Sequence, residues 1–445
     1  MNSILGAFAA TWLFYFVLLV LLPIRYTSGE LPQALLVLGI YVALSLAVAL
    51  GMRTWQQSKP VVQSRHPRLI RPLSDREVNH LVLMGIAASA IGIVLIAYVR
   101  VSVQGIDFSQ GLAVARELWR NEGEERSGVA SPLSIPGYGL GFFFLAATFI
   151  GHLHWESLKP LTRRLLLFST VIFVAGYSVL TGGRSILLLQ LISMLSAGAV
   201  RRAQGRLGFP GRFWRNLISG LVVFLVAIGY VLYVFSDRAA KSGISADLYA
   251  QGAINYMGGE ATDGFRAIGF WPEPASSITY FAVITGGYIT HSAGTLASVM
   301  EYSSRPGITM FVGLQLLLAR LGAVQPADDS WALSGAFLSL PGSVWYEFAL
   351  PGVIAAALVT GACLAVSSRF VSGSAGGGLS VAFSAASLIV AMTSPLIFVP
   401  DALAFPFMVL GYVGLSAYSQ FRFGERNWWR VGHEVRVACL TEKNR

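Results

Sequence analysis

The stretch from Ile4 to Leu22 reads ILGAFAATWLFYFVLLVLL and contains 19 residues without one charged side chain. A helix of about 20 apolar residues is long enough to cross the hydrocarbon core of a bilayer. Backbone N–H and C=O groups in hydrocarbon need partners within the protein, so the stretch predicts a helix. Because no basic region precedes it and no small-residue cleavage site follows it, we expect a retained membrane helix.

Nine further apolar runs of similar length follow along the chain. Hydrophobic residues make up 55% of the 445 residues and charged residues 12%, whereas about a quarter of the residues in a soluble domain are charged. The runs lie at 34–52, 80–99, 133–151, 165–181, 185–200, 217–235, 347–366, 379–397 and 402–418. The sequence therefore predicts an all-α integral membrane protein, in which residues 1–445 form a single polytopic domain of about ten transmembrane helices.

The distribution of charge predicts the orientation of these helices. If the N-terminus lies inside, the inward segments contain 21 of the 32 Lys and Arg residues, and the outward segments contain 16 of the 22 acidic residues. Cytoplasmic loops are enriched in Lys and Arg, so both termini are expected in the cytoplasm. This topology accounts for the net charge of +10, and no nucleic-acid partner is expected.

One outward loop, residues 236–346 between the seventh and eighth helices, is much longer than the others. It contains two apolar stretches, 279–300 and 307–322, which are either an extra pair of spans or amphipathic and re-entrant helices at the outer interface. We favour the interface, because four polar or charged residues fall in or beside these stretches. They are His291, Glu301, Arg305 and Arg320.

Arginine is the residue type that could bind an anion at the outer face. Arg184 lies in the tight turn 181–185, and an arginine fork at a membrane surface can hold a phosphate, although an interfacial anchor is the alternative. The long loop adds Arg238, Lys241, Arg266, Arg305 and Arg320. For any one of these residues alone, a solvated surface charge is the simpler interpretation.

Candidate general bases lie in the same loop or at its end. They are His291, Glu301, Asp328, Asp329 and Glu347. Glu347 opens the run 347–366, where a carboxylate must be paired or face a wet cavity, so a catalytic base and a structural ion pair are both open.

Aromatic residues of the loop suit either sugar stacking or an interfacial belt. They are Tyr249, Tyr256, Phe265, Phe270, Trp271, Tyr280, Phe281 and Tyr288. No metal or cofactor is expected, because His152 and His154 have no third ligand beside them, the two cysteines lack ligand spacing, and no nucleotide-binding motif occurs.

Within this architecture, three local features resemble the bacterial Wzy-type O-antigen and capsule polymerases, which join oligosaccharide repeat units. One is the turn Gly182-Gly183-Arg184-Ser185 between two close helices. The second is the stretch from Tyr280 to Gly287, Tyr-Phe-Ala-Val-Ile-Thr-Gly-Gly, which leads through the segment 301–311. The third is Trp345-Tyr346-Glu347-Phe348-Ala-Leu-Pro351-Gly352, which is similar to the family's aromatic-acidic entry into a late helix.

The resemblance implies a multi-pass glycosyltransferase of the bacterial inner membrane that acts at the periplasmic face in lipopolysaccharide biosynthesis. It would transfer a growing glycan from one undecaprenyl diphosphate to a repeat unit on another, by an inverting-type reaction without a metal. Three sets of residues would do this. Arg184, Arg238, Arg266, Arg305 and Arg320 would bind the diphosphate, Glu347, Glu301 or His291 would deprotonate the acceptor, and Tyr280, Tyr288 and Tyr346 would contact sugars. A chain-length regulator and a flippase are the protein partners it suggests.

Two other functions stay open from the sequence. An O-antigen ligase shares the many helices and the long outer loop but transfers finished polymer to another lipid. A transporter or flippase for a lipid-linked or small polar substrate would place polar residues and broken helices near the membrane midplane. Most runs are uncharged in the middle, which favours chemistry at the outer interface.

Overall fold

The computed structural model describes residues 3–58, 73–110, 133–181, 185–209, 243–273, 275–300, 338–372, 378–397 and 405–419, with several single positions between them. Among these residues, seven helices are long and apolar enough to cross a membrane. Two shorter apolar helices, Ser380–Thr393 and Phe405–Ser419, follow near the C-terminus. The prediction of an all-α membrane protein is confirmed, while the predicted run 217–235 lies outside the described ranges.

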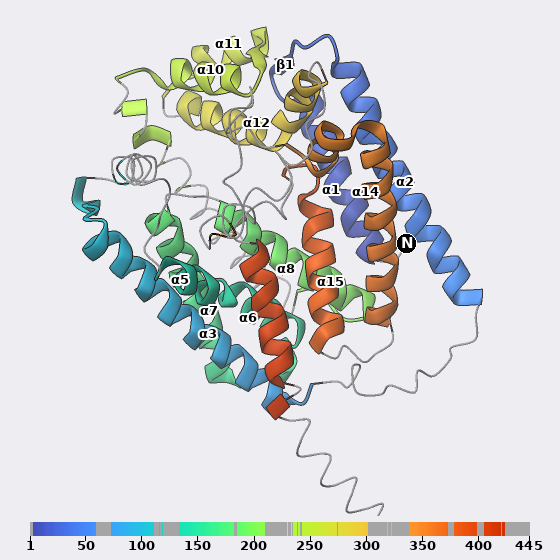
Figure 1. Ribbon diagram of the computed structural model, residues 1–445. Helices are drawn as coiled ribbons and strands as arrows, with labels where there is room; N and C mark the ends of the chain where they lie inside the picture. The colour runs from blue at the N-terminus through green and yellow to red at the C-terminus, as the bar shows by residue number, and fades with distance from the viewer. Residues whose placement is uncertain are drawn as a thin grey trace, which may run out of the picture.

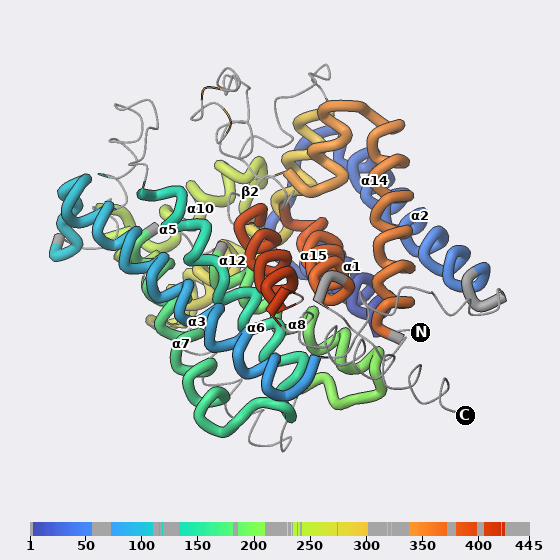
Figure 2. Tube along the Cα trace, turned by 60° about the horizontal axis from the view of Figure 1, so that its bottom comes forward, coloured from blue at the N-terminus to red at the C-terminus, as the bar shows by residue number. Residues whose placement is uncertain are grey.

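The predicted runs correspond to helices with somewhat different ends. The helices are α1 (Ser3–Leu21), α2 (Leu31–Ser58), α3 (Asp75–Tyr98), α5 (Ser134–Gly141), α6 (Phe143–Leu153), α7 (Pro160–Thr181), α8 (Ser185–Ala203), α14 (Leu340–Ser372) and α15 (Gly378–Thr393). Helices α1, α8 and α15 pack against one another, although they are far apart in the sequence (Figures 1 and 2).

Helix α3 shows how local sequence sets a boundary that hydropathy misses. The backbone N–H of Glu77 donates to Ser74 Oγ at 3.4 Å, and the N–H of Ser74 donates to Glu77 Oε2 at 2.6 Å. This capping box satisfies two N–H groups that the first helical turn leaves without partners. The helix therefore begins at Asp75, five residues before the apolar run that predicted it.

Glycines set the close packing of α3 on α5. A Cβ added to Gly92 would overlap the backbone of Gly141, and one added to Gly141 would overlap the hydroxyl of Tyr177. Small residues let membrane helices approach until their backbones touch. Over the predicted run 133–151, α5 and α6 follow each other directly at Phe142 and together form one candidate span, Ser134–Leu153.

A small cap covers one end of the helices. It consists of α10 (Ala246–Tyr256), β2 (Gly259–Ala261), α11 (Asp263–Ala267), the 3₁₀ turn η4 (Ile268–Phe270) and α12 (Ala275–Val299). Strand β2 pairs antiparallel with β1 (Ile24–Tyr26), which follows α1 directly. The cap has its own apolar cluster, in which Phe265, Tyr280 and Phe281 are buried. The turn after the first membrane helix is thus an integral part of the cap.

Helix α12 lies between the rest of the cap and the membrane helices. Of its 25 residues, 16 are buried, and it contacts α10 and β1 as well as α1, α2 and α14. In Figure 1 it runs crosswise to α1, α14 and α15. The sequence favoured an amphipathic helix at the interface for 279–300. The helix lies at the end of the bundle, but protein covers most of its surface. The second predicted stretch, 307–322, falls almost entirely outside the described residues.

Helix α14 is broken near its start. Ala349 adopts φ 51° and ψ −148°, a conformation outside the helical range, and Pro351 follows. A Cβ on Gly352 would come within 2.6 Å of the Val344 carbonyl oxygen, so the two parts fold tightly against each other. At 1.5 Å per residue, 351–372 is about 33 Å long, which matches a bilayer core of about 30 Å. The part before the break therefore lies at the end of the bundle.

Candidate functional site

Hydroxyl groups attach α12 to α1 at the capped end. Tyr15 OH lies 2.8 Å from Ser292 Oγ, and Ser292 Oγ donates to the Pro395 carbonyl at 2.6 Å. Because Ser292 has one proton and uses it on Pro395, Tyr15 is the donor to Ser292. Tyr26 OH lies 3.0 Å from Thr290 Oγ1. These contacts fix both neighbours of residue 291 on α12.

His291 is the buried imidazole between these two fixed positions. Its Nδ1 lies 2.8 Å from the Tyr288 carbonyl oxygen. A carbonyl only accepts hydrogen bonds, so Nδ1 carries the proton in this contact and Nε2 is the basic nitrogen of the neutral ring. A histidine whose tautomer and orientation are both fixed is suited to act as a general base through Nε2.

Glu347 is the second predicted base that the structure describes. Hydropathy predicted that Glu347 opens a membrane helix. This was wrong, because α14 begins at Leu340 and the glutamate lies at the end of its first part, two residues before Ala349. The side chain is buried. A residue held in a rarely populated backbone conformation, as Ala349 is, costs about 1–3 kcal/mol and is found mostly at functional sites. Helices α12 and α14 contact each other, so Glu347 and His291 belong to adjoining elements.

Most of the predicted diphosphate ligands cannot be placed. Arg184, Arg238, Arg305 and Arg320, together with the predicted base Glu301, lie outside the described residues. Arg266 is described, on α11. Its side chain is 74% exposed, and its Nη1 lies 3.4 Å from a carboxylate oxygen of Asp263. A solvated pair of this kind contributes little, and the structure does not bring Arg266 to the buried His291 and Glu347.

The predicted sugar-contacting tyrosines differ in their surroundings. Tyr280 is buried in the cap, with its ring centroid 4.9 Å from that of Phe265. Tyr346 is buried in a small cluster with Val299 and Leu338. Tyr288 is the most exposed of the three, and its ring stands edge-on to His291 with centroids 6.2 Å apart. Tyr288 is therefore the tyrosine best placed to meet a ligand beside His291.

Arg100 is a residue that the sequence analysis missed. It is buried at the end of α3, in the π-helical turn η1 (Val99–Val103). Its Nη1 donates to Gln104 Oε1 at 2.7 Å, and its Nη2 donates to Tyr138 OH at 3.0 Å. Single π-helical turns occur frequently at functional sites, and charged groups at membrane depth are costly enough to be functional by default. The signal in the sequence was an arginine directly after the apolar run 80–99.

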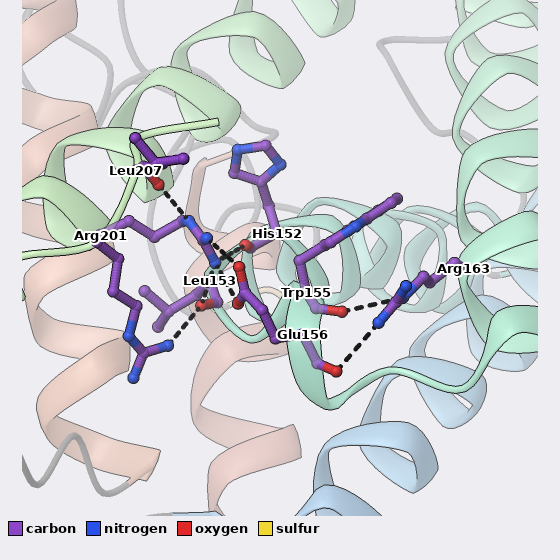
Figure 3. A network of polar contacts seen from close by, with 8 residues as sticks. His152, Leu153, Trp155, Glu156, Arg163, Arg201 and Leu207 are labelled. Carbon is purple, nitrogen blue, oxygen red and sulfur yellow. Dashed lines mark hydrogen bonds and ion pairs between the residues drawn. The ribbon is translucent and has the colours of Figure 1, made fainter. Parts of the chain in front are cut away.

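A separate polar network holds the opposite end of the bundle together (Figure 3). The buried guanidinium of Arg201 donates to Glu156, to the His152 and Leu153 carbonyls that end α6, and to the Leu207 carbonyl. The hydrogen bond from Arg201 lowers the pKa of Glu156 to about 2. Every acceptor except Glu156 is a backbone carbonyl, so we interpret this network as structural.

The capped end thus has a positioned histidine on α12 and a buried glutamate beside a strained break on the adjoining helix α14. The buried Arg100 lies at the end of α3, which packs on α5, α6 and α7. Such groups can deprotonate a hydroxyl and attract an anion. No model of a known protein family matches the chain, and no curated protein or solved structure matches it significantly.

Proposed function

We propose that the protein is a bacterial oligosaccharide repeat-unit polymerase of the inner membrane, with the capped end facing the periplasm. The observation that carries the proposal is His291, a histidine with a fixed tautomer on a helix anchored on both sides of it. The excess of Lys and Arg in the segments at the opposite end supports the orientation.

In the proposed reaction, the acceptor is the terminal sugar hydroxyl of a lipid-linked repeat unit. His291 Nε2 or the Glu347 carboxylate takes the hydroxyl proton, and the oxygen attacks the anomeric carbon of the donor glycan. The bond from that carbon to the diphosphate breaks, and the polyprenyl diphosphate leaves with its electron pair. A diphosphate is a good leaving group that needs neutralisation of its charge, which arginines supply. Arg100 and Arg184 are the candidates for that role.

Substitution of the two bases tests the proposal. A strain that lacks the gene would be complemented with His291→Ala or Glu347→Gln, and the glycan on its lipid core would be separated by length. We expect single repeat units in place of long polymer. His80→Ala is the matched control, because His80 is a partly buried histidine near the opposite end that contacts Tyr418. Normal polymer in both variants would refute the proposed roles, and loss of all repeat units would indicate a ligase.

A transporter is the second candidate, because the break in α14 resembles the broken helices of secondary transporters. Those breaks lie near the membrane midplane and expose backbone groups to a substrate there. In this chain about 33 Å of helix follows the break, enough to cross the bilayer by itself. The location of the break at the end of the span favours an interfacial enzyme. Accumulation of labelled lipid-linked repeat units on the inner side in a null strain would instead support transport.

A further inference from the structure

The structure separates the aromatic residues of the cap into two groups. Phe265, Tyr280 and Phe281 are buried in the cap. Phe270 and Trp271, which end the η4 turn, are 90% and 52% exposed. A phenylalanine and a tryptophan side by side on a protein surface are unfavourable in water, so a partner or a lipid phase is expected to cover them.

The position of the cap relative to the membrane follows from one hydrogen bond. The backbone N–H of Thr262 donates to the Pro23 carbonyl at 3.2 Å, and Pro23 lies two residues after the end of the membrane helix α1. Val20, in the last turn of α1, is 82% exposed, as a residue that faces lipid would be. Residue 262 therefore lies at the level where the chain leaves the hydrocarbon.

The distance from this level to Phe270 is short. Residues 263–270 form α11 and η4, and at 1.5 Å and 2.0 Å per residue they advance by about 14 Å at most. The headgroup region is about 5–8 Å thick on each side of the hydrocarbon. Phe270 and Trp271 therefore lie at most about 6–9 Å beyond the headgroups, and within them if the two segments run along the membrane surface. Figure 1 shows α11 beside β1 at the end of α1.

We propose that Phe270 and Trp271 insert into the headgroup region of the leaflet at the capped end and anchor the cap to the bilayer. Tryptophan and phenylalanine are the side chains that prefer this region. Arg266, one helical turn earlier and largely exposed, provides a cation for a lipid phosphate. The inference holds whatever reaction the protein performs.

The test is the accessibility of a spin label on the full-length protein in lipid nanodiscs. The label is attached to Phe270→Cys in a chain that also carries Cys363→Ala and Cys439→Ser. Molecular oxygen concentrates in lipid and a neutral nickel chelate stays in water, so the ratio of their relaxation effects reports depth. Val20→Cys is the reference for lipid, and the free spin label in buffer is the reference for water.

We expect the oxygen-to-nickel ratio at Phe270 to be several-fold higher than that of the free label and to approach that at Val20. A ratio equal to that of the free label would place the turn in water and overturn the proposal. Protection of Phe270 from both reagents would show that protein covers the patch, as a second copy or another chain would, and would overturn it as well. The ratio at Val20 must exceed that of the free label, which checks that the labelled protein is inserted in the bilayer.

Discussion

Replacement of Arg201 by alanine should destabilise the protein measurably without touching the proposed site. The guanidinium donates to the Leu207 carbonyl at 2.8 Å, to the Leu153 carbonyl at 3.0 Å and to the His152 carbonyl at 3.2 Å. The Leu153 carbonyl also accepts from Arg206 at 3.4 Å. The Leu207 and His152 carbonyls therefore lose the donor that the guanidinium provides. Each buried acceptor left unsatisfied lowers the free energy of unfolding by about 1–3 kcal/mol.

The ion pair with Glu156 adds little to this loss, because the Glu156 side chain is 59% exposed and stays hydrated when Arg201 is removed. Together these contributions give a loss of about 3 kcal/mol, within the range for removal of one partner of a buried charge network. For a chain of this length, that corresponds to a fall in melting temperature of roughly 3 °C or more.

The assay is thermal unfolding in detergent, followed by the fluorescence of the ten tryptophans. Arg202→Ala is the matched control, because Arg202 is the exposed neighbour of Arg201 on α8. Glu156→Gln should lie between the two. If Arg201→Ala melts at the same temperature as Arg202→Ala, the guanidinium does not hold the ends of α6 and α8 together, and the reasoning is wrong.

Three further predictions concern pH, packing and Arg100. Burial lowers the pKa of His154 from 6.5 to about 4. The folded protein therefore favours the neutral imidazole, and this contribution to stability is complete above pH 6.5. It is lost as the pH falls from 6.5 toward 4, because only the unfolded chain takes up the proton in that range. The melting temperature should drop over that range, and the drop should shrink in His154→Asn. Gly141→Ala should lower the free energy of unfolding by about 1–3 kcal/mol, because the added Cβ overlaps the Tyr177 hydroxyl. Gly139→Ala is the control and should be tolerated, since its Cβ meets only Phe407 at 3.6 Å. Equal melting temperatures of the two variants would contradict this. Arg100→Lys keeps the positive charge but loses the paired N–H groups of the guanidinium. The loss of one charge-assisted hydrogen bond to the diphosphate should lower polymer yield about tenfold. An unchanged yield at equal protein level would exclude diphosphate binding by Arg100.

The membrane helices could be predicted because the information for them is local. A run such as 4–22 specifies its own helix, since each backbone group finds its partner within the run. Prediction of the first part of α14 failed for a local reason as well. The sequence Leu340-Pro-Gly-Ser343 reads as a turn, although proline is accepted in the first turn of a helix. The apolar run 347–366 therefore begins seven residues after the helix does.

The features that could not be predicted depend on contacts between distant segments. Three-residue strands such as β1 have no pattern of their own, and β1 is defined only by its pairing with β2. The tautomer of His291 is set by the Tyr288 carbonyl oxygen, which accepts from its Nδ1 only once α12 has formed. Arg100 is held by the hydroxyl of Tyr138, which lies on another helix. All the predicted arginine ligands except Arg184 lie in the long outer loop, a criterion that includes the exposed Arg266 but not Arg100.

The pairing of β1 with β2 has a consequence for the order of events during synthesis. Tyr26 pairs with Gly259, so more than 230 residues are made after β1 before its partner exists. At about 5–20 residues per second, this takes roughly 10–50 s. During that time the turn between α1 and α2 has been inserted, but its edge is unpaired and Thr262 is not yet there to bind Pro23. The cap therefore closes late, and a chain that stops before residue 259 leaves its first hairpin unfinished even though its first two membrane helices are complete.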